Sequence, residues 1–286
     1  MLMATALVTG GTSGIGAEFA RSLAGRGFDL VLVARDVTRL NAMAAELHAS
    51  DGIYVEVFPA DLADRVDVAR VVERIVDPLR PIEFLVNNAG FGVHSSLLVE
   101  DTSPHDRALE VMCRTVLVLG GAAARTMKAR GHGTILNVSS TAGFITMGSY
   151  SAIKAWVTSY SEGLAVELRG TGVTVTALCP GWVRTEFHSR AGIRASSIPS
   201  ALWIDVEPLV AAALRDVDRG RVMSIPTVRY RALTWFARHL PRRTIRYISG
   251  AISSSRNDEN ETHSEATQTN PPVDPNNSVS TPGQGN

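Results

Sequence analysis

The sequence predicts an α/β fold in which a doubly wound parallel sheet of about seven strands carries helices on both faces. Strand-like and helix-like patterns alternate along the chain, as they do where helical crossovers join parallel strands. The first buried strand also runs directly into a glycine-rich turn and a helix. A chain of 286 residues with 45% hydrophobic composition can bury one sizeable core, so we expect one folded domain.

Seven short apolar or β-branched segments account for the expected strands. They are, in chain order, residues 4–9, 29–34, 53–57, 83–86, 134–138, 173–178 and 222–225. Helix-like patterns lie between them, the longest from Pro104 to Arg130 and from Tyr150 to about Arg169. Gly170 and Gly172 are the stop signals that should end the second of these helices.

The charges near the C-terminus are distributed unevenly, although the formal net charge is zero. Residues 219–250 contain eight Arg and no Asp or Glu, whereas the residues after Ser255 contain five acids and one Arg. The last stretch has almost no large apolar residue and cannot offset its ordering entropy by burial. We therefore assign residues 1–252 to the domain, with an Arg-rich helical segment at 226–250, and residues 253–286 to a disordered polar tail.

Cysteine usage and hydropathy favour a cytoplasmic protein. Cys113 and Cys179 lie in apolar surroundings without a CxxC pattern, so we interpret them as reduced packing residues and expect no metal site. The short apolar N-terminus lacks the basic region of a signal peptide. No stretch reaches the roughly 20 apolar residues of a membrane span.

The turn after the first strand has the composition of a phosphate-binding loop. Gly10-Gly11-Thr12-Ser13-Gly14-Ile15-Gly16 separates the strand from the first helix. Glycines allow a tight turn and a close approach to a pyrophosphate, whose charge would meet unpaired N–H groups at the start of the helix. An ordinary tight turn is the alternative for this segment taken alone.

A second pattern suggests acid–base chemistry. Tyr150 and Lys154 are four residues apart in a predicted helix and therefore lie on one face. An ammonium beside a phenol favours the phenolate, so we expect Lys154 to lower the pKa of Tyr150 from its usual value near ~10. An exposed pair on a helix surface would have the same spacing.

Four motifs together resemble the short-chain dehydrogenase/reductase family. They are Thr9-Gly10-x-x-x-Gly14-x-Gly16, Asn87-Asn88-Ala89-Gly90, a Ser preceding Tyr150-x-x-x-Lys154, and Pro180-Gly181. The resemblance extends from about residue 4 to the strand at 221–225 and implies a Rossmann-type fold and a nicotinamide-dependent oxidoreductase. It implies a catalytic set of Ser140, Tyr150 and Lys154, with Tyr150 as general acid or base.

The resemblance also implies a set of cofactor-binding residues. They are Gly10, Thr12, Ser13, Gly14, Ile15, Gly16, Arg35, Asp61, Leu62, Asn88, Ala89, Gly90, Tyr150, Lys154, Pro180, Gly181, Val183 and Thr185. Among them, Asp61 is similar to the family's adenine-contacting residue, although it could instead cap the helix near Asp64. Asn87 would tie neighbouring strands together, as the family's first Asn does.

Arg35 at the end of the second strand favours NADP(H) as the cofactor. A carboxylate at this place would repel a 2′-phosphate, whereas an arginine binds it. The alternative is a surface arginine paired with Asp36. Arg39 could assist Arg35.

One position departs from the family pattern. Met112 stands where the family usually has an Asn that helps to hold a proton-relaying water, and a thioether is at best a weak acceptor. Three explanations stay open: the water has another partner, turnover is slower, or the helix is shifted. A non-catalytic NADP-binding regulator is the corresponding alternative function.

On the substrate side, we expect residues 187–199 to form a lid. Trp182, Phe187, Ile198 and Trp203 would line an apolar pocket, unless they pack in the core. We therefore predict reduction of a carbonyl, or oxidation of a secondary alcohol, in an apolar, acyl-type or sterol-like substrate. The resemblance implies a homodimer or homotetramer, and no nucleic-acid partner is expected. The Arg-rich segment could contact an anionic membrane or an acyl carrier, or it could simply be a packed terminal helix.

Overall fold

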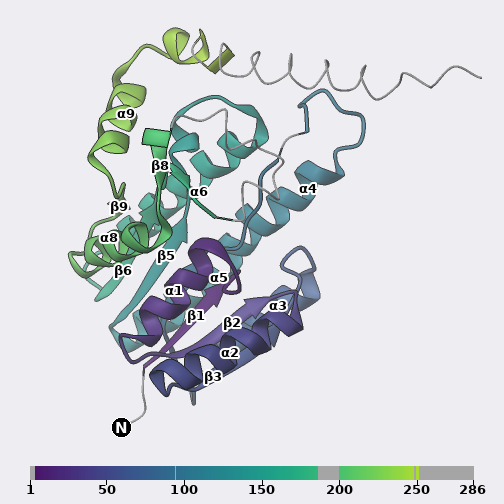
Figure 1. Ribbon diagram of the computed structural model, residues 1–286, viewed down its shortest axis with the longest axis vertical. Helices are drawn as coiled ribbons and strands as arrows, with labels where there is room; N and C mark the ends of the chain where they lie inside the picture. Colours follow the sequence, from purple (N-terminus) through teal and green to yellow (C-terminus); the bar gives the residue numbers. More distant parts are fainter. Residues whose placement is uncertain (1–3, 94, 186–199, 248, 251–286) are drawn as a thin grey trace, which may run out of the picture.

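The computed structural model describes residues 4–93, 95–185, 200–247 and 249–250. Its main sheet has seven parallel strands in the order β3-β2-β1-β4-β5-β6-β9 (Figure 1). The strands are β1 (Thr5–Thr9), β2 (Asp29–Ala34), β3 (Val55–Pro59), β4 (Ile82–Asn87), β5 (Gly133–Val138), β6 (Val173–Leu178) and β9 (Met223–Ser224). This is the predicted doubly wound sheet of Rossmann type, and each of the seven expected strands is present.

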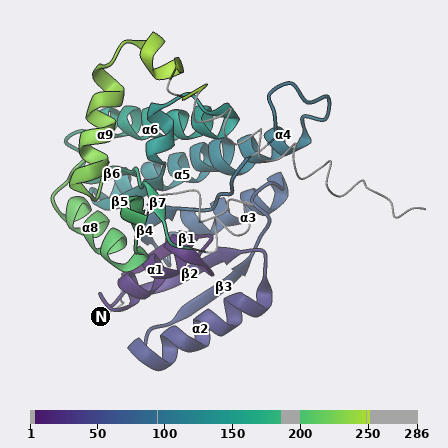
Figure 2. The same cartoon turned by 45° about the horizontal axis from the view of Figure 1, so that its top comes forward.

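Helices cover both faces of the sheet, as Figures 1 and 2 show. The helices are α1 (Gly14–Ala24), α2 (Val37–Asp51), α3 (Arg65–Val76), α4 (Ser103–Leu109), α5 (Thr115–Arg130), α6 (Gly148–Glu167), α8 (Val206–Asp218) and α9 (Val228–His239). One core cluster joins the sheet to α3, α5 and α6, and a second joins it to α1, α2 and α8. Because both faces are covered, the central strands are buried along most of their length.

The strand order reverses between β2 and β4, which both pair with β1. In open α/β sheets, such a reversal opens a crevice at the carboxyl ends of the strands. The turns after β1, β4, β5 and β6 all leave the sheet at that edge. The topology thus brings the four sequence motifs together.

Three local features differ from the sequence-based expectation. The long helix expected from Pro104 to Arg130 is interrupted by a π-helical turn, Glu110–Arg114. The last strand of the main sheet is two residues long, and a separate pair, β7 (Trp182–Val183) and β8 (Trp203–Ile204), follows β6. The short helices η2 (Thr141–Phe144) and η4 (Ser200–Leu202) and a helical stretch at residues 242–247 are further described elements. The expected lid at 187–199 and tail at 253–286 lie outside the described residues.

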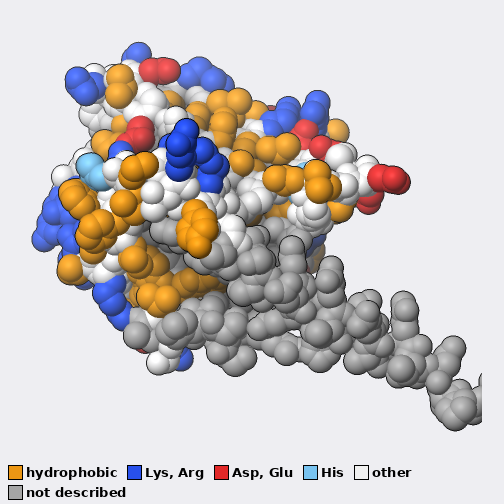
Figure 3. Space-filling model, turned by 90° about the horizontal axis from the view of Figure 1, so that it is seen from above, with side chains coloured by type: hydrophobic (Ala, Val, Ile, Leu, Met, Phe, Trp, Pro, Cys, Tyr) orange, Lys and Arg blue, Asp and Glu red, His pale blue; other side chains and the backbone are white. Residues whose placement is uncertain are grey.

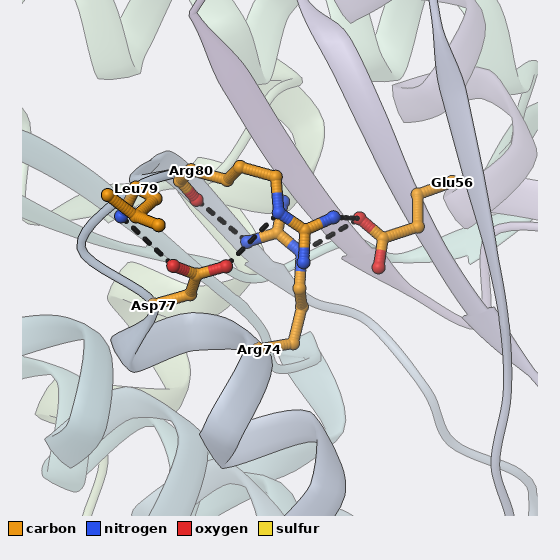
Figure 4. A network of polar contacts seen from close by, with 5 residues as sticks. All are labelled: Glu56, Arg74, Asp77, Leu79 and Arg80. Atoms are coloured by element: carbon orange, nitrogen blue, oxygen red, sulfur yellow. Dashed lines mark hydrogen bonds and ion pairs between the residues drawn. The ribbon is translucent and has the colours of Figure 1, made fainter.

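A buried arginine fixes the edge of the sheet against α3 (Figure 4). The Arg74 side chain is 5% exposed and donates to Glu56 on β3 at 2.8 Å and to the Arg80 carbonyl at 2.7 Å. Arg80 in turn contacts Glu56 and Asp77. The charge of Arg74 is therefore compensated, as a buried charge must be.

In the part of the chain that the structure describes, no helix is both long enough and apolar enough to cross a bilayer.

Candidate active site

The glycine turn is held in shape by the end of β4. Thr9 Oγ1 accepts the backbone N–H groups of Asn88 at 2.9 Å and Ala89 at 3.1 Å. The Asn88 side chain donates to the carbonyls of Thr9 at 2.9 Å and Gly10 at 3.3 Å. The amide of Asn88 thus supports the turn, and the neighbouring Asn87 ties β4 to β5 through a 2.9 Å bond to Asn137.

Two glycines of this turn have no room for a side chain. A Cβ at Gly16 would lie 2.2 Å from the Gly10 carbonyl oxygen and 2.4 Å from Asn88 Nδ2. Gly10 has φ +67°, a backbone conformation that favours glycine. A Cβ at Gly14 would meet the Thr185 side chain at 3.3 Å, so the turn after β1 touches the segment after β6.

The other predicted cofactor residues around the turn differ in exposure. Thr12, Ser13 and Ile15 are partly exposed at the start of α1, whose first turn contains no acidic residue. This leaves the positive end of the helix dipole uncompensated by a carboxylate, as an anion site requires. Leu62 and Val183 are buried with their side chains in the core, so only their backbones could face a cofactor.

The structure separates the two serines after β5. The Ser139 side chain is buried and hydrogen-bonds the Lys154 carbonyl at 2.6 Å and Thr158 Oγ1 at 2.7 Å. Ser140 is partly exposed, accepts from the Ala142 N–H at 3.1 Å, and hydrogen-bonds the side chain of Tyr150. Ser139 is therefore part of the packing under α6, whereas Ser140 adjoins the phenol.

Tyr150 and Lys154 lie together, but not as an ammonium–phenolate pair. Lys154 is buried, donates to the Val138 carbonyl at 2.9 Å, and holds its Nζ 5.7 Å from the centre of the Tyr150 ring. Burial raises the pKa of Tyr150 to about 12, against the opposing effect of the hydrogen bond with Ser140. Burial likewise lowers the pKa of Lys154 to about 8. The expectation that Lys154 would lower the pKa of Tyr150 is wrong for this structure, because desolvation of the phenol dominates.

Met112 lies beside the glycine that ends the Asn87-Asn88-Ala89-Gly90 motif. The side chain is 1% exposed and belongs to the π-helical turn. A Cβ at Gly90 would be 3.0 Å from Met112 Sδ and 3.7 Å from Lys154 Nζ. The thioether therefore lies beside Gly90, on the side of that glycine where Lys154 Nζ also approaches.

The two cysteines are thiols without redox partners. Burial raises the pKa of Cys113 and that of Cys179 to about 11. Neither forms a disulfide, and no cluster of His, Cys, Asp or Glu suited to a metal ion occurs among the described residues.

At the far end of the crevice, Arg35 is exposed after β2. Asp36, its expected alternative partner, instead caps α2 through the Arg39 N–H at 3.0 Å and lies 3.6 Å from the Arg39 guanidinium. Asp61 is held by a residue that the sequence did not indicate: Arg107 contacts both carboxylate oxygens, at 3.0 and 2.8 Å. Burial opposes ionisation of Asp61, but the hydrogen bonds from Arg107 and from the Ala63 N–H outweigh it and lower the pKa.

The turn after β6 rests on α9. The Pro180 carbonyl accepts from Thr141, and a Cβ at Gly181 would lie 2.0 Å from the Tyr230 ring. The Tyr230 hydroxyl accepts from the Trp182 N–H at 3.1 Å and donates to the Leu202 carbonyl at 2.8 Å. Tyr230 is thus a structural element of the site that sequence reasoning missed, since its partners are 28 and 48 residues away.

The expected apolar pocket is described only in part. Phe187 and Ile198 lie outside the described residues, while Trp182 and Trp203 face each other across the β7–β8 pair with ring centres 6.2 Å apart. Both rings are partly exposed beside the turn after β6.

Comparison with known proteins identifies the family. The model of the short chain dehydrogenases matches residues 4–194. A Streptomyces virginiae protein designated a ketoacyl reductase of the monensin polyketide synthase is 40% identical over 197 residues, covering 65% of this chain and 72% of the relative. The chain therefore belongs to the short-chain dehydrogenase/reductase family of oxidoreductases.

Solved structures agree with this assignment over nearly the whole chain. A short-chain dehydrogenase from Sphingobium yanoikuyae in complex with NADPH is 32% identical, has a TM-score of 0.75, and covers 97% of this chain and 99% of its own. The bulky-bulky ketone specific alcohol dehydrogenase from Comamonas testosteroni is 29% identical with a TM-score of 0.72, and 98% of each chain is covered.

Proposed function

We propose that this protein is an NADP(H)-dependent reductase of apolar or acyl-type ketones, with Tyr150 as the general acid. The observation that carries the proposal is the hydrogen bond between Ser140 and Tyr150 at the carboxyl edge of the sheet, with the Nζ of the buried Lys154 5.7 Å from the centre of the Tyr150 ring. A nicotinamide cofactor supplies the hydride when it is bound. The relative solved with NADPH and the position of Arg35 support NADP(H).

The chain's own residues have separate roles in this proposal. Tyr150 gives its proton to the carbonyl oxygen, and Ser140 donates a hydrogen bond to the same oxygen as negative charge develops there. Lys154, protonated below its pKa of about 8, supplies positive charge and a donor for ribose hydroxyls. Tyr150 is protonated at neutral pH, as a proton donor to a carbonyl must be, because burial raises its pKa to about 12.

The residues around the glycine turn fit a dinucleotide. The turn has no side chain at Gly10, Gly14 or Gly16, and the first turn of α1 contains no carboxylate. Arg35 would bind a 2′-phosphate, Asp36 beside it is held by Arg39, and Asp61 is held by Arg107. Both oxygens of the Asp61 carboxylate already accept hydrogen bonds from Arg107. In this proposal, the contact of Asp61 with the adenine is therefore weaker than the family resemblance implies.

The substrate class rests on the relatives and on the two tryptophans beside the turn after β6. The two relatives named above act on, or are designated for, a bulky ketone and a ketoacyl group. Self-association is a further proposal: Leu109 of α4, Leu117 of α5 and Trp156 of α6 line a hollow that also contains Asp106, Glu110, Cys113 and Arg114. Light scattering of wild type and Leu117→Arg tests it, and a monomeric wild type would overturn it.

The test of the function is NADPH oxidation with a panel of ketones, aldehydes and 3-oxoacyl thioesters. Tyr150→Phe should lower kcat by about 10²- to 10⁴-fold while NADPH affinity stays nearly unchanged. Ser140→Ala should also lower kcat, whereas Ser139→Ala should act mainly on stability. NADPH binding by wild type without turnover of any carbonyl would instead favour the non-catalytic regulator.

A further inference from the structure

Helix α9 is attached to the domain along a narrow line. Tyr230 and Thr234 are its two buried residues, and Ala237 is partly exposed. These three positions follow the i, i+4, i+7 spacing of one helix face. Every other residue of α9 is exposed.

The exposed part of α9 includes a row of large apolar side chains. Leu233, Phe236 and Leu240 are 51%, 54% and 37% exposed and lie on one face at i, i+3 and i+7. Trp235 is 55% exposed on the other side of the helix, and Tyr247 follows at 81%. Apolar groups gathered in this way on a surface mark an interaction site more often than scattered ones do.

Arginines surround this apolar row. Arg229, Arg231, Arg238, Arg242, Arg243 and Arg246 are all exposed, and the sequence from 219 to 250 has no acidic residue. Arg221, which precedes them, pairs with Asp216, but none of these six has a carboxylate within ion-pair distance in the described part of the chain. On the left of Figure 3, where α9 lies, hydrophobic and basic side chains are interspersed.

Two contacts join this surface to the segment between Ser140 and Tyr150. The Arg238 guanidinium lies 5.8 Å from the centre of the Phe144 ring, and the Thr146 N–H donates to Ser249 Oγ at 3.2 Å. Phe144 and Thr146 belong to the segment between Ser140 and Tyr150. A partner bound to α9 would therefore lie beside the substrate side of the crevice.

We propose that the outer surface of α9 and residues 242–247 docks on the surface of an anionic lipid bilayer. The guanidinium groups match lipid phosphates, and the row of Leu233, Phe236 and Leu240 gives the helix an apolar side that can enter the headgroup region. An acidic carrier protein would satisfy the arginines, whereas a bilayer offers phosphates to the arginines and a continuous hydrocarbon layer to the exposed aromatic and leucine side chains. Both features together favour the bilayer.

The experiment is co-sedimentation of the full-length protein with vesicles of phosphatidylcholine alone or mixed with phosphatidylglycerol. Binding to the mixed vesicles at low salt and its decrease at moderate salt are expected, because salt screens the arginines. Arg238→Gln/Arg242→Gln/Arg243→Gln/Arg246→Gln should weaken the partition coefficient by about tenfold or more. Leu233→Gln/Phe236→Gln should remove the part of the binding that persists in salt.

A matched control removes four exposed charges elsewhere, in Arg125→Gln/Lys128→Gln/Arg169→Gln/Arg215→Gln. It should bind vesicles within about twofold of wild type, since these residues lie outside α9. Thermal unfolding of each variant checks that the domain is folded. Absence of binding by wild type at low salt, or equal loss in the control variant, would overturn the proposal. Binding to an acidic carrier protein but to neither vesicle would overturn it in favour of a protein partner.

Discussion

The turn between β1 and α1 and the turn after β6 border the same edge of the sheet, yet different interactions hold them. The first is fixed by neighbouring backbone and by Thr9 and Asn88, which bond to the turn and to each other. The second leads into strands of two residues and is held by residues from distant parts of the chain, Thr141 at the Pro180 carbonyl and Tyr230 at the Trp182 N–H. One wall of the crevice is therefore held by local structure, and the other by contacts between residues far apart in the sequence.

This difference suits the two ligands that the site must accept. The proposed dinucleotide is the same for every substrate, so a turn with saturated polar groups can be complementary to it in advance. The substrate wall carries the tryptophans of β7 and β8 and adjoins the exposed surface of α9. A wall anchored at few points can change in sequence without disturbing the cofactor side.

The largest effect is expected from a change in the glycine turn between β1 and α1. Gly16→Ala should abolish NADPH binding or prevent folding, because the new Cβ would lie 2.2 Å from the Gly10 carbonyl oxygen. Thermal unfolding with and without NADPH measures both outcomes. Gly163→Ala in α6 is the control: nothing lies within 4 Å of its Cβ, so this variant should gain up to about 1 kcal/mol from helix propensity. Normal NADPH binding by Gly16→Ala would show that the turn adapts.

A smaller effect is expected at the open end of the same wall. Arg35→Asp should weaken NADPH binding by about 10- to 100-fold and relatively favour NADH, because a charge-assisted contact contributes about 1.5–3 kcal/mol. Titration of both cofactors measures the change, and Arg35→Gln separates loss of charge from its reversal. Tighter binding of NADH than of NADPH by wild type would contradict the role of Arg35.

The same contrast explains what the sequence could predict. The strands 29–34 and 173–178 were predicted with their observed bounds, since a run of buried β-branched and aliphatic residues between turn signals is a local pattern. The positions of Gly16, Ser140 and Lys154 followed from motifs of a few residues. These features are all encoded within short windows.

Long-range features had no such signal. The contacts of Tyr230 with Trp182 and Leu202, and of Arg107 with Asp61, join residues 28 to 48 positions apart. The direction of the Tyr150 pKa shift was missed because spacing on a helix reveals proximity but not burial. The π-helical turn around Met112 likewise interrupts a pattern that reads as a continuous helix.

Tyr230→Phe tests the contact between α9 and the turn after β6. Removal of the hydroxyl takes a partner from the Trp182 N–H and from the Leu202 carbonyl, which should cost about 1–3 kcal/mol of unfolding free energy. We expect a several-fold rise in KM for the ketone with little change in NADPH affinity. Urea unfolding and steady-state kinetics measure these effects, and Tyr247→Phe, at an 81% exposed residue, is the control. An equal rise in the Kd of NADPH would show that the two walls are not independent.

The smallest expected effect concerns Lys154, which lies between the two walls. Burial lowers the pKa of Lys154 to about 8, so the ammonium is present below that pH and is lost as the pH rises through it. If the charged form holds the cofactor, NADPH affinity should be constant from about pH 6 to 7 and about three- to tenfold weaker at about pH 9. Fluorescence titration of NADPH across this range measures the effect. Lys154→Met, which cannot titrate, should bind NADPH more weakly, and its affinity should not depend on pH.

A wild-type affinity that does not change up to about pH 9 would mean that bound NADPH raises the pKa of Lys154 beyond the range tested, or that the cofactor wall alone determines affinity. A Lys154→Met variant with wild-type affinity would establish that the cofactor wall alone determines NADPH affinity.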